Sequence, residues 1–439
     1  MKKAFDYTTT DNNRGNYTIS DPEHRRLIEK IAGRSIDDLE KENPGLLVVK
    51  GKFKDDVYES KICSLVNNKL HTENIVGFIG ISDENGQHVN LQIHSRFDSD
   101  KKQYFFQYML QKVFSVTILD FDKHFSNENI FELFLAVLFP HYLKRAFRQG
   151  LFKKYKRFHY NNSNVKGAVD VKRHIRQNIP FTGNIAYTTR EFSFDNPVTQ
   201  LIRHTIYYLE NRNWLFDKST EFRQAAQEIA NYTPDFNPQN KIRIMQLNRQ
   251  RITHPYFYEY EPLRKICLKI LQHEGVSLTA HNKTDKIYGV VFDCAWLWEE
   301  YLNTIFISGK KKYIHPENKN REKAIYLFEG NTYPRYPDFY NDKAVLDAKY
   351  KHLEKENNEL NRDDIHQMIT YMHVLNKQKG GFLFPFSSTG TIPIGQLKGI
   401  GGDISKISLG IPVSESFSEF TDSIGNNEQE FLSLLNLLY

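Results

Sequence analysis

Cysteine is scarce in this sequence, where Cys63, Cys267 and Cys294 stand alone among 439 residues. None belongs to a CxxC pair, and an odd number of thiols cannot all pair within one chain. The spacing therefore supports neither a disulfide framework nor a structural zinc site. Single buried thiols are typical of a reducing compartment, so we expect a cytoplasmic protein.

Long hydrophobic runs are also missing. The longest apolar segment, "LFLAVLFP" at residues 133–140, is much shorter than the roughly 20 residues that a membrane helix needs. The first residues, "MKKAFDYTTT", carry basic side chains but are not followed by the apolar stretch of a signal peptide. We therefore expect no membrane partner and no secretion signal.

The P-loop motif GxxxxGK[ST] does not occur. The nearest approach, "GTIPIGQL" from Gly390, has Gln396 and Leu397 where the lysine and the hydroxyl residue would stand. A P-loop needs both to hold phosphates and Mg²⁺, so we expect that this chain binds no nucleotide cofactor. The sixteen histidines form neither HxH nor HExxH and give no zinc signature.

Apolar residues are plentiful, since 40% of the chain is hydrophobic and 14% aromatic, which indicates a folded protein. The hydrophobic pattern changes twice along the chain, and we predict an α+β multidomain fold. Its parts are a β-rich N-terminal domain at residues 1–120, a basic helical middle domain at 121–285 with irregular connections, and a C-terminal α/β domain at 286–439.

A hairpin signal lies in the N-terminal domain. The alternating segments "NIVGFIGIS" and "HVNLQIHSRF" flank "DENGQ", in which Asn85 and Gly86 form a turn dipeptide. We therefore expect a β-hairpin around these two residues.

Positive charge is concentrated between Lys144 and Arg176, where eleven Lys or Arg residues stand against one acidic residue, Asp170. Such a run can follow a phosphate backbone, with Tyr155 and Phe158 among the interleaved stacking groups, or it can be a solvated face of helix and loop. The sequence leaves both interpretations open.

Charged residues also appear where a buried strand is predicted. The run "AVLDAKY" at residues 344–350 has strand length and is rich in branched and aromatic side chains. Alternate residues of a strand share a face, which places Val345, Asp347 and Lys349 together. Burying an aspartate and a lysine costs several kcal/mol unless they pair, bind a metal or face a cleft. This face is therefore a candidate functional site.

Two predicted helices add polar residues near this strand. In "CAWLWEEYLNTIF", Glu299 borders the apolar stripe, whereas Glu300 points away from it and should be solvated. In "DDIHQMITYMHVL", Asp364, Gln367 and Tyr371 follow one edge of the apolar stripe. We expect these three residues to line the same cleft as the strand.

These residues match the needs of metal-assisted phosphodiester hydrolysis. The carboxylates of Asp338, Asp347 and Glu299, with the backbone carbonyl of Ala348, would provide the all-oxygen coordination that Mg²⁺ prefers, and Mn²⁺ would be a substitute. The metal would activate a water and neutralise charge on the scissile phosphate, while Lys349 would orient the water or stabilise the phosphate. Taken alone, Asp338 after a proline would be an ordinary turn residue.

The order Glu299, Pro337-Asp338, Asp347-Ala348-Lys349 and Gln367-x-x-x-Tyr371 resembles the PD-(D/E)XK nuclease superfamily. Four longer segments make the chain similar, in order and approximate spacing, to the McrC family of restriction subunits: "GAVDVKRHIRQNIP" at 167–180, "REFSFDNPVTQLIRH" at 190–204, "WEEYL" at 298–302 and "DIHQMITYM" at 364–372. The resemblance covers roughly residues 125–385, and the N-terminal 120 residues match only in general character.

This resemblance implies a C-terminal PD-(D/E)XK domain in a Mg²⁺-dependent endonuclease subunit. Such a subunit works with a separate McrB-like AAA+ GTPase and acts on double-stranded DNA that contains 5-methylcytosine. In the implied site, Asp338 and Asp347 are the metal ligands and Lys349 is the catalytic lysine. The accessory residues are Glu299, Gln367 and Tyr371.

By the same analogy, the N-terminal domain is a candidate arm for docking on the GTPase. The hairpin near Gly86, with His94 and Arg96 on its second strand, is the predicted contact.

Two other functions stay open. The chain could be a non-catalytic subunit that activates the motor and holds DNA, or a stand-alone repair-type nuclease. Intact Asp338, Asp347 and Lys349 argue against the first, because a decayed site tends to lose such costly residues. Cutting without a partner would support the second.

Overall fold

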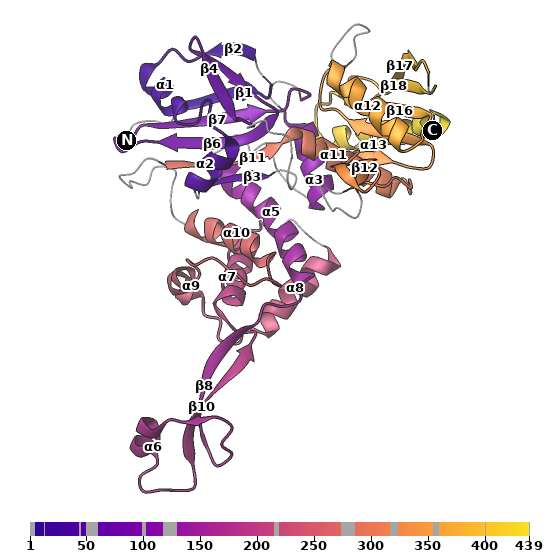
Figure 1. Ribbon diagram of the computed structural model, residues 1–439. Helices are drawn as coiled ribbons and strands as arrows, with labels where there is room; N and C mark the ends of the chain where they lie inside the picture. Colours follow the sequence, from indigo (N-terminus) through magenta and orange to yellow (C-terminus); the bar gives the residue numbers. More distant parts are fainter. Residues whose placement is uncertain are drawn as a thin grey trace. The chain divides into compact units, whose positions relative to one another are not determined.

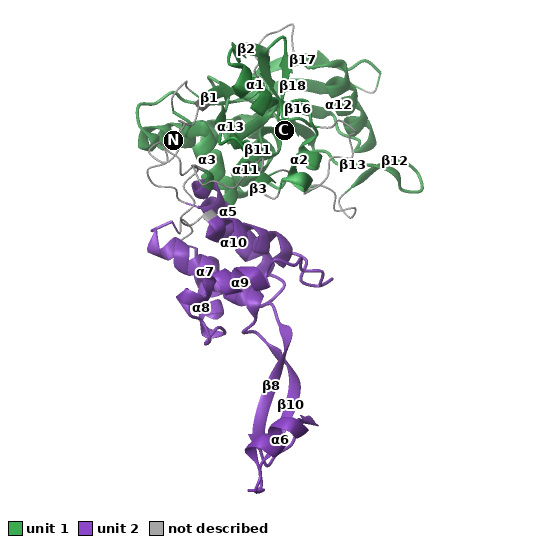
Figure 2. Cartoon of the chain, turned by 90° about the vertical axis from the view of Figure 1, so that its left-hand side faces the viewer, with its two compact units in different colours: residues 1–115, 119–131, 281–439 green, residues 116–118, 132–280 purple. Residues whose placement is uncertain are grey.

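The computed structural model describes residues 5–12, 14–43, 45–49, 60–98, 102–116, 130–214, 219–273, 286–316, 324–353, 360–399 and 401–438. It divides into two compact units (Figure 2), with unit 1 formed by residues 1–115, 119–131 and 281–439 and unit 2 by residues 116–118 and 132–280. Unit 2 is thus inserted in the chain of unit 1. The segments predicted as separate domains at 1–120 and 286–439 group together in unit 1.

A five-stranded mixed sheet in unit 1 takes strands from both sides of the insertion (Figure 1). Its order is β1–β7–β6–β11–β3, with bounds Phe5–Thr10, His88–His94, Ile75–Ser82, Lys286–Asp293 and Gly45–Val49. β11 lies antiparallel to β6 and parallel to β3. Residues 286–293 therefore complete the N-terminal sheet instead of beginning a C-terminal domain, because their backbone pairs with strands more than 190 positions earlier in the chain.

The predicted hairpin is confirmed. β6 and β7 pair antiparallel from Gly77 and Ile93 to Ser82 and His88. In the turn between them, Oδ1 of Asp83 accepts hydrogen bonds from two backbone N–H groups, each at 2.9 Å. These two donors are residues 85 and 87, so the side chain of the turn's first residue closes the loop.

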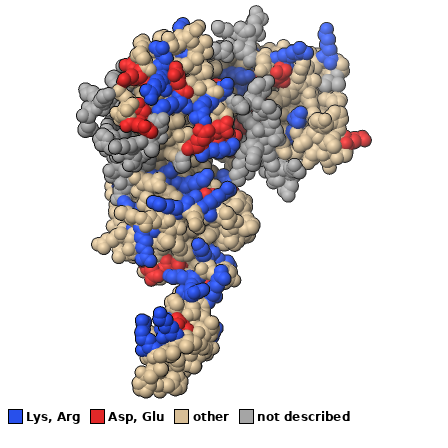
Figure 3. Space-filling model, turned by 60° about the vertical axis from the view of Figure 1, so that its left-hand side comes forward, with Lys and Arg blue, Asp and Glu red and all other residues tan. Residues whose placement is uncertain are grey.

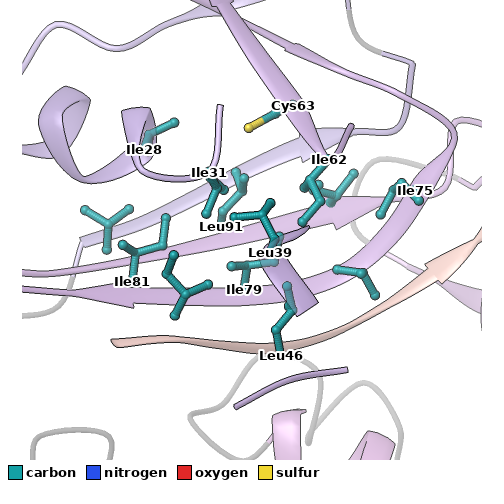
Figure 4. Close-up of a cluster of buried hydrophobic side chains, with 14 of the residues drawn as sticks. Ile28, Ile31, Leu39, Leu46, Ile62, Cys63, Ile75, Ile79, Ile81 and Leu91 are labelled. Atoms are coloured by element: carbon teal, nitrogen blue, oxygen red, sulfur yellow. The ribbon is translucent and has the colours of Figure 1, made fainter. Parts of the chain in front are cut away.

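A hydrophobic core covers one face of this sheet (Figure 4). A three-stranded sheet of order β2–β5–β4 and two short helices surround it, with bounds Arg14–Thr18, Lys69–Thr72 and Cys63–Val66 for the strands and Pro22–Glu29 and Ile36–Glu42 for α1 and α2. Ile79 and Leu91 of the large sheet are fully buried here. Cys63 lies in this core, and Cys267 and Cys294 are also buried, as expected for structural thiols.

A second five-stranded sheet forms the C-terminal part of unit 1. Its order is β14–β15–β16–β18–β17, with bounds Phe339–Tyr340, Ala344–Ala348, Lys379–Phe386, Asp403–Gly410 and Gly390–Gln396. β15, β16 and β18 are parallel, and both edge strands are antiparallel to their neighbours. Helix α12 (Arg362–Val374) connects β15 to β16, because parallel neighbours need a long crossover. A hairpin of β12 (Ile325–Phe328) and β13 (Thr332–Arg335) precedes the sheet.

Three helices of unit 1 meet at a buried carboxylate. Glu428 of α13 (Phe417–Leu438) accepts hydrogen bonds from the hydroxyl of Tyr108 in α3 (Tyr104–Phe114) at 3.0 Å and from that of Tyr301 in α11 (Cys294–Ser308) at 2.8 Å. A buried carboxylate is costly unless it is hydrogen-bonded, so these contacts favour one mutual arrangement of the three helices.

Unit 2 combines helices with a protruding hairpin (Figure 1). It contains most of α5 (Ile130–Phe147), then α7 (Pro197–Asn211), α8 (Thr220–Asn231), the short turn η1 (Pro238–Asn240), α9 (Lys241–Leu247) and α10 (Tyr260–His273). Asn196 and Thr199 form the capping box that begins α7. No helix in the described ranges of the chain is long and apolar enough to cross a membrane.

The hairpin corrects the prediction of irregular basic connections in this region. β8 (Lys154–Asn162) and β10 (Ile185–Ser193) pair antiparallel along their whole length. The short strand β9 (Ala168–Val169) and helix α6 (Val171–Gln177) lie in the connection between them. The sequence did not reveal β8 as a strand, because most of it is exposed on both faces and it lacks the alternation of a half-buried strand.

A glycine allows the close approach of β6 and β11. Gly77 has φ +145°, and a Cβ built there would lie 2.2 Å from the carbonyl oxygen of Val290. We expect Gly77→Ala to lower the free energy of unfolding by roughly 2–4 kcal/mol, because backbone atoms of the neighbouring strand would have to move. Chemical denaturation measures this loss.

The matched control is Gly425→Ala in α13, where an added Cβ meets no atom within 4 Å. Alanine is the better helix former, so this variant should gain up to about 1 kcal/mol. Equal stability of the two variants would contradict the steric argument.

Candidate active site

Strand β15 carries the predicted charged face into the interior of unit 1. Residues 344–347 are buried, and the side chain of Asp347 is only 5% exposed. The strand ends at Ala348, but the backbone N–H of Lys349 still donates to the carbonyl oxygen of Leu383 in β16 at 2.8 Å. The predicted strand is therefore confirmed, and Lys349 is fixed at its end.

Lys349 lies between two carboxylates. Its Nζ is 2.7 Å from Oδ2 of Asp347 and 2.9 Å from Oδ1 of Asp364. Nζ of Lys351 contacts the other oxygen of Asp364 at 3.0 Å. The prediction that Asp347 and Lys349 share a face is confirmed, and Asp364 lies beside them as expected.

The first turn of α12 holds Asp364 in place. Oδ1 of Asn361 accepts a hydrogen bond from the backbone N–H of Asp364 at 2.7 Å, and Oδ2 of Asp364 accepts one in return at 3.3 Å. This capping box satisfies N–H groups at the start of the helix. It also keeps one carboxylate in reach of Lys349.

These neighbours set the protonation state of the lysine. Burial lowers the pKa of Lys349, but the carboxylates of Asp347 and Asp364 outweigh that effect and raise it above the ordinary value. For Asp364 burial raises the pKa, yet the two lysines bring it below its ordinary value. The lysine and Asp364 are therefore both charged at neutral pH.

Asp338 sits against the end of β15. Its Oδ2 accepts a hydrogen bond from the backbone N–H of Ala348 at 2.7 Å. Burial raises the pKa of Asp338 to about 7, and the negative charge of Asp347 adds to this rise. Burial likewise raises the pKa of Asp347, against the lowering effect of Lys349. The structure thus places two mutually repelling carboxylates next to each other.

Glu299 of helix α11 lies near the carboxylates of Asp338 and Asp347. Asp293 caps this helix, and the indole N–H of Trp298 donates to the carbonyl oxygen of Leu383 at 3.2 Å, the same atom that accepts from Lys349. Burial raises the pKa of Glu299 well above its ordinary value, and the charges of Asp338 and Glu300 raise it further.

His315 belongs to this cluster and was missed in the sequence. Its Nδ1 lies 2.7 Å from the backbone carbonyl oxygen of Asp338, and its ring stacks on that of Phe339 at 4.8 Å. Burial lowers the pKa of His315, but the nearby carboxylate of Glu300 and the hydrogen bond to the carbonyl of Asp338 raise it above its ordinary value. A lone histidine before a proline carries no spacing signal that would have revealed it.

The prediction of a solvated Glu300 is wrong. Its side chain is only 22% exposed, and Oε1 lies 3.6 Å from Nε2 of His315, while Oε1 of Glu299 lies 3.7 Å from Nδ1. The prediction assumed that α11 is buried on one face only. The helix also has His315 as a neighbour on the side of Glu300, so Glu300 is partly covered.

Gln367 and Tyr371 contact each other. Nε2 of Gln367 donates to the hydroxyl of Tyr371 at 2.8 Å. Burial raises the pKa of Tyr371 to about 12, and the charges of Asp347 and Asp338 contribute to this rise. Tyr371 therefore lies near the carboxylates, whereas Gln367 is exposed at the edge of the helix.

The donor set fits a hard divalent cation in part. Asp338, Asp347 and the backbone carbonyl of Ala348 offer oxygen ligands, and a cation would stabilise the charged forms of the two carboxylates, which burial disfavours. In the described part of the chain, no group of three or more His, Cys, Asp or Glu side chains is arranged to hold a metal. Glu299 does not complete such a group, so one or two carboxylates and water would have to suffice, as is usual for Mg²⁺.

Comparison with known proteins identifies the family to which the chain belongs. Residues 70–385 match the family model described as McrBC 5-methylcytosine restriction system component. The chain is similar to one in a half-complex of Thermococcus gammatolerans McrB AAA+ hexamers with bound McrC, at 14% identity and a TM-score of 0.53, covering 99% of this chain and 100% of that one. A chain of the cryo-EM structure of the Thermococcus gammatolerans McrBC complex has 15% identity and a TM-score of 0.33, with 71% and 89% covered. No curated protein matches.

The match covers well over half of the chain and includes every candidate site residue from Glu299 to Tyr371. The protein is thus a component of a McrBC-type restriction system. More narrowly, the chain belongs to the McrC family, as its resemblance to that family predicted.

Replacing Asp338 by Asn tests how strongly burial and the nearby charge of Asp347 disfavour the charged form of Asp338. Because the pKa of Asp338 rises from 3.8 to about 7 on folding, the folded state binds the proton more tightly than the unfolded state. Stability should therefore fall as the pH increases through this range. We expect Asp338→Asn to raise the free energy of unfolding by roughly 1–3 kcal/mol at about pH 8 without divalent cations, and to have little effect near pH 4.

Chemical denaturation at both pH values measures the difference. Asp342→Asn is the control, because Asp342 is exposed in the turn before β15 and should not respond. Loss of stability in Asp338→Asn at the higher pH would show that its charged form is favourable in the fold.

Proposed function

We propose that this chain is the Mg²⁺-dependent endodeoxyribonuclease subunit of a 5-methylcytosine-dependent restriction system. The observation that carries the proposal is a protonated lysine, Lys349, held between Asp347 and Asp364 beside the partly buried Asp338. Membership in the McrC family supports it, because the matched description names a 5-methylcytosine restriction system.

In this mechanism Asp338, Asp347 and the carbonyl of Ala348 would hold the ion. When bound, Mg²⁺ would supply a more acidic water and neutralise charge on the scissile phosphate. The backbone N–H of Ala348 and the carbonyl contact from His315 orient Asp338 for this task.

Lys349 acts in its charged form. Its raised pKa makes it a poor general base at neutral pH, so its role is to donate hydrogen bonds and stabilise negative charge on the phosphate. An ammonium group has three N–H donors, and the carboxylates of Asp347 and Asp364 engage two of them. One donor is left for a phosphate oxygen or for the attacking water.

The partner in this proposal is a McrB-like AAA+ GTPase. The sequence has no P-loop of its own, and the similar solved chain comes from an assembly of McrB AAA+ hexamers with bound McrC. Arg96 is a poor docking residue for the hairpin near Gly86, because its side chain is only 9% exposed and its guanidinium pairs with Asp11 at 2.9 Å. Deleting residues 1–120 would not test docking, because β1, β3, β6 and β7 share a sheet with β11.

The test is plasmid cleavage with Mg²⁺ on methylated and unmethylated DNA, with and without the McrB-like partner and with GTP or ATP. We expect cutting of methylated DNA only when partner and nucleotide are both present. Lys349→Ala and Asp347→Ala should each lower the rate by about 100-fold or more. Both variants should keep the partner, as measured by co-elution.

Lys343→Ala is the matched control, because Lys343 is an exposed lysine in the turn before β15. It should cut like wild type. If wild type and Asp347→Ala behave alike in every reaction, the catalytic assignment fails and the role of a non-catalytic activator takes its place. Cutting by wild type alone, without partner or nucleotide, would identify a stand-alone nuclease.

Metal binding has its own readout. We expect calorimetric titration of Mg²⁺ into wild type to show binding that Asp347→Asn loses and Asp342→Asn keeps. Lys349→Met should bind Mg²⁺ at least as tightly as wild type, because it removes a positive charge 2.7 Å from a ligand oxygen. Loss of binding in Lys349→Met with full binding in Asp347→Asn would contradict the ligand assignment.

A further inference from the structure

Two aromatic rings and two cations are stacked at the base of the hairpin in unit 2. Tyr155 of β8 lies directly opposite Phe192 of β10, and their rings stack with centroids 3.9 Å apart. Nζ of Lys153 lies 5.2 Å from the centre of the Phe192 ring, and Cζ of Arg190 lies 4.7 Å from that of Tyr155. Alternate positions of the two strands place all four side chains on one face.

This face continues into a cavity of about 510 Å³. Its lining includes Lys153, Phe192, Phe194, His254, Tyr256 and Phe257. The ring of Tyr256 stands at 82° to that of Phe257, and Tyr256 is 61% exposed, while Phe192 is 55% exposed. Contiguous exposed aromatic surface is unfavourable in water and marks a binding site.

The charge of this region selects the kind of ligand. Residues 132–280 contain 23 Lys and Arg against 12 Asp and Glu, whereas the rest of the chain has 36 against 41. Figure 3 shows Lys and Arg predominating over the helices and the hairpin of this unit on the face drawn. An excess of positive charge around aromatic rings favours a polyanion that also has flat rings.

The cations of the stacked face are available for such a ligand. The ion pairs in the described residues of unit 2 use other cations, namely Arg145, Arg148, Lys156, Arg173, Arg212 and Arg264. Lys156 and its partner Asp235 illustrate the contrast, since Lys156 lies on the opposite face of β8 from Tyr155. None of the described residues that line the cavity is a carboxylate.

We propose that this face binds a single nucleic-acid strand and that the cavity receives one unstacked base of it. The cavity volume lies within the range of small-ligand sites, and its rings offer the stacking surface that a base needs. Lys153 at the mouth and Arg190 further along the strand contact successive phosphates. A duplex hides the faces of its bases, so it cannot use the rings in this way.

The proposal concerns unit 2 and does not depend on the nuclease site in unit 1. It is tested by fluorescence anisotropy of the full-length chain with labelled oligothymidylate of about 20 nucleotides, in EDTA so that no metal-dependent cutting occurs. Oligouridylate and a duplex of the same length are measured in parallel. The first arm distinguishes DNA from RNA, and the second tests for base stacking.

Tyr256→Ala and Phe192→Ala should each weaken strand binding by roughly 5- to 100-fold, as loss of a stacking ring does. Lys153→Ala and Arg190→Ala should each reduce the slope of log affinity against log salt by about 0.7, as expected for one lost phosphate contact on a single strand. The controls are Phe328→Ala and Lys69→Ala in unit 1, which remove an exposed ring and an exposed lysine and should change neither quantity.

Three results would overturn the proposal. One is equal strand affinity in Tyr256→Ala, Phe192→Ala and the controls. Another is duplex binding as tight as strand binding. The third is loss of the McrB-like partner in the cavity variants with strand binding unchanged, which would assign the cavity to a side chain of that protein.

Discussion

The candidate active site depends on one constraint, which is that a single strand end must hold several charges out of water. Asp347 lies in β15 and Lys349 comes just after its end, with both side chains on the same side and largely buried. Such charges are tolerated only when they are paired and hydrogen-bonded. The parallel neighbour β16 supplies the backbone acceptor for Lys349, and the crossover helix α12 supplies Asp364 from its capping box. The βαβ connection and the charge arrangement therefore require each other.

The candidate active site is also connected to the N-terminal sheet of unit 1, because β11 of that sheet continues directly into α11. β11 completes the N-terminal sheet, and Asp293 at its end caps α11, which carries Glu299 to the carboxylates. Trp298 donates to the carbonyl oxygen of Leu383 that also accepts from Lys349, so the helix and the strand end share one anchoring atom. After the inserted unit, the chain re-enters the N-terminal sheet, where β11 pairs with β6 and β3.

Local pattern was enough to predict the parts of this site that lie close together in the sequence. Strand alternation predicted the shared face of Asp347 and Lys349, and an Asn-Gly dipeptide predicted the β6–β7 hairpin. The local pattern did not predict the long-range contacts. The pairing of β11 with β6 joins residues more than 190 positions apart, and His315 reaches Asp338 and Glu300 through tertiary packing alone. Periodicity reports which face of an element is buried, but it does not identify the neighbour that buries it.

Charge is used in opposite ways in the two units. In unit 1 the lysines of the site are matched by carboxylates, as Lys349 and Lys351 are by Asp364. A matched cation attracts a distant polyanion only weakly, because its field is cancelled within a few ångströms. In unit 2 the cations exceed the anions, and Lys153 and Arg190 lie over aromatic rings, which leave their charge uncancelled. The net charge of +6 therefore understates the positive charge that residues 132–280 carry. The positive excess belongs to the inserted unit, whereas the matched charges of the site in unit 1 position one lysine and two aspartates.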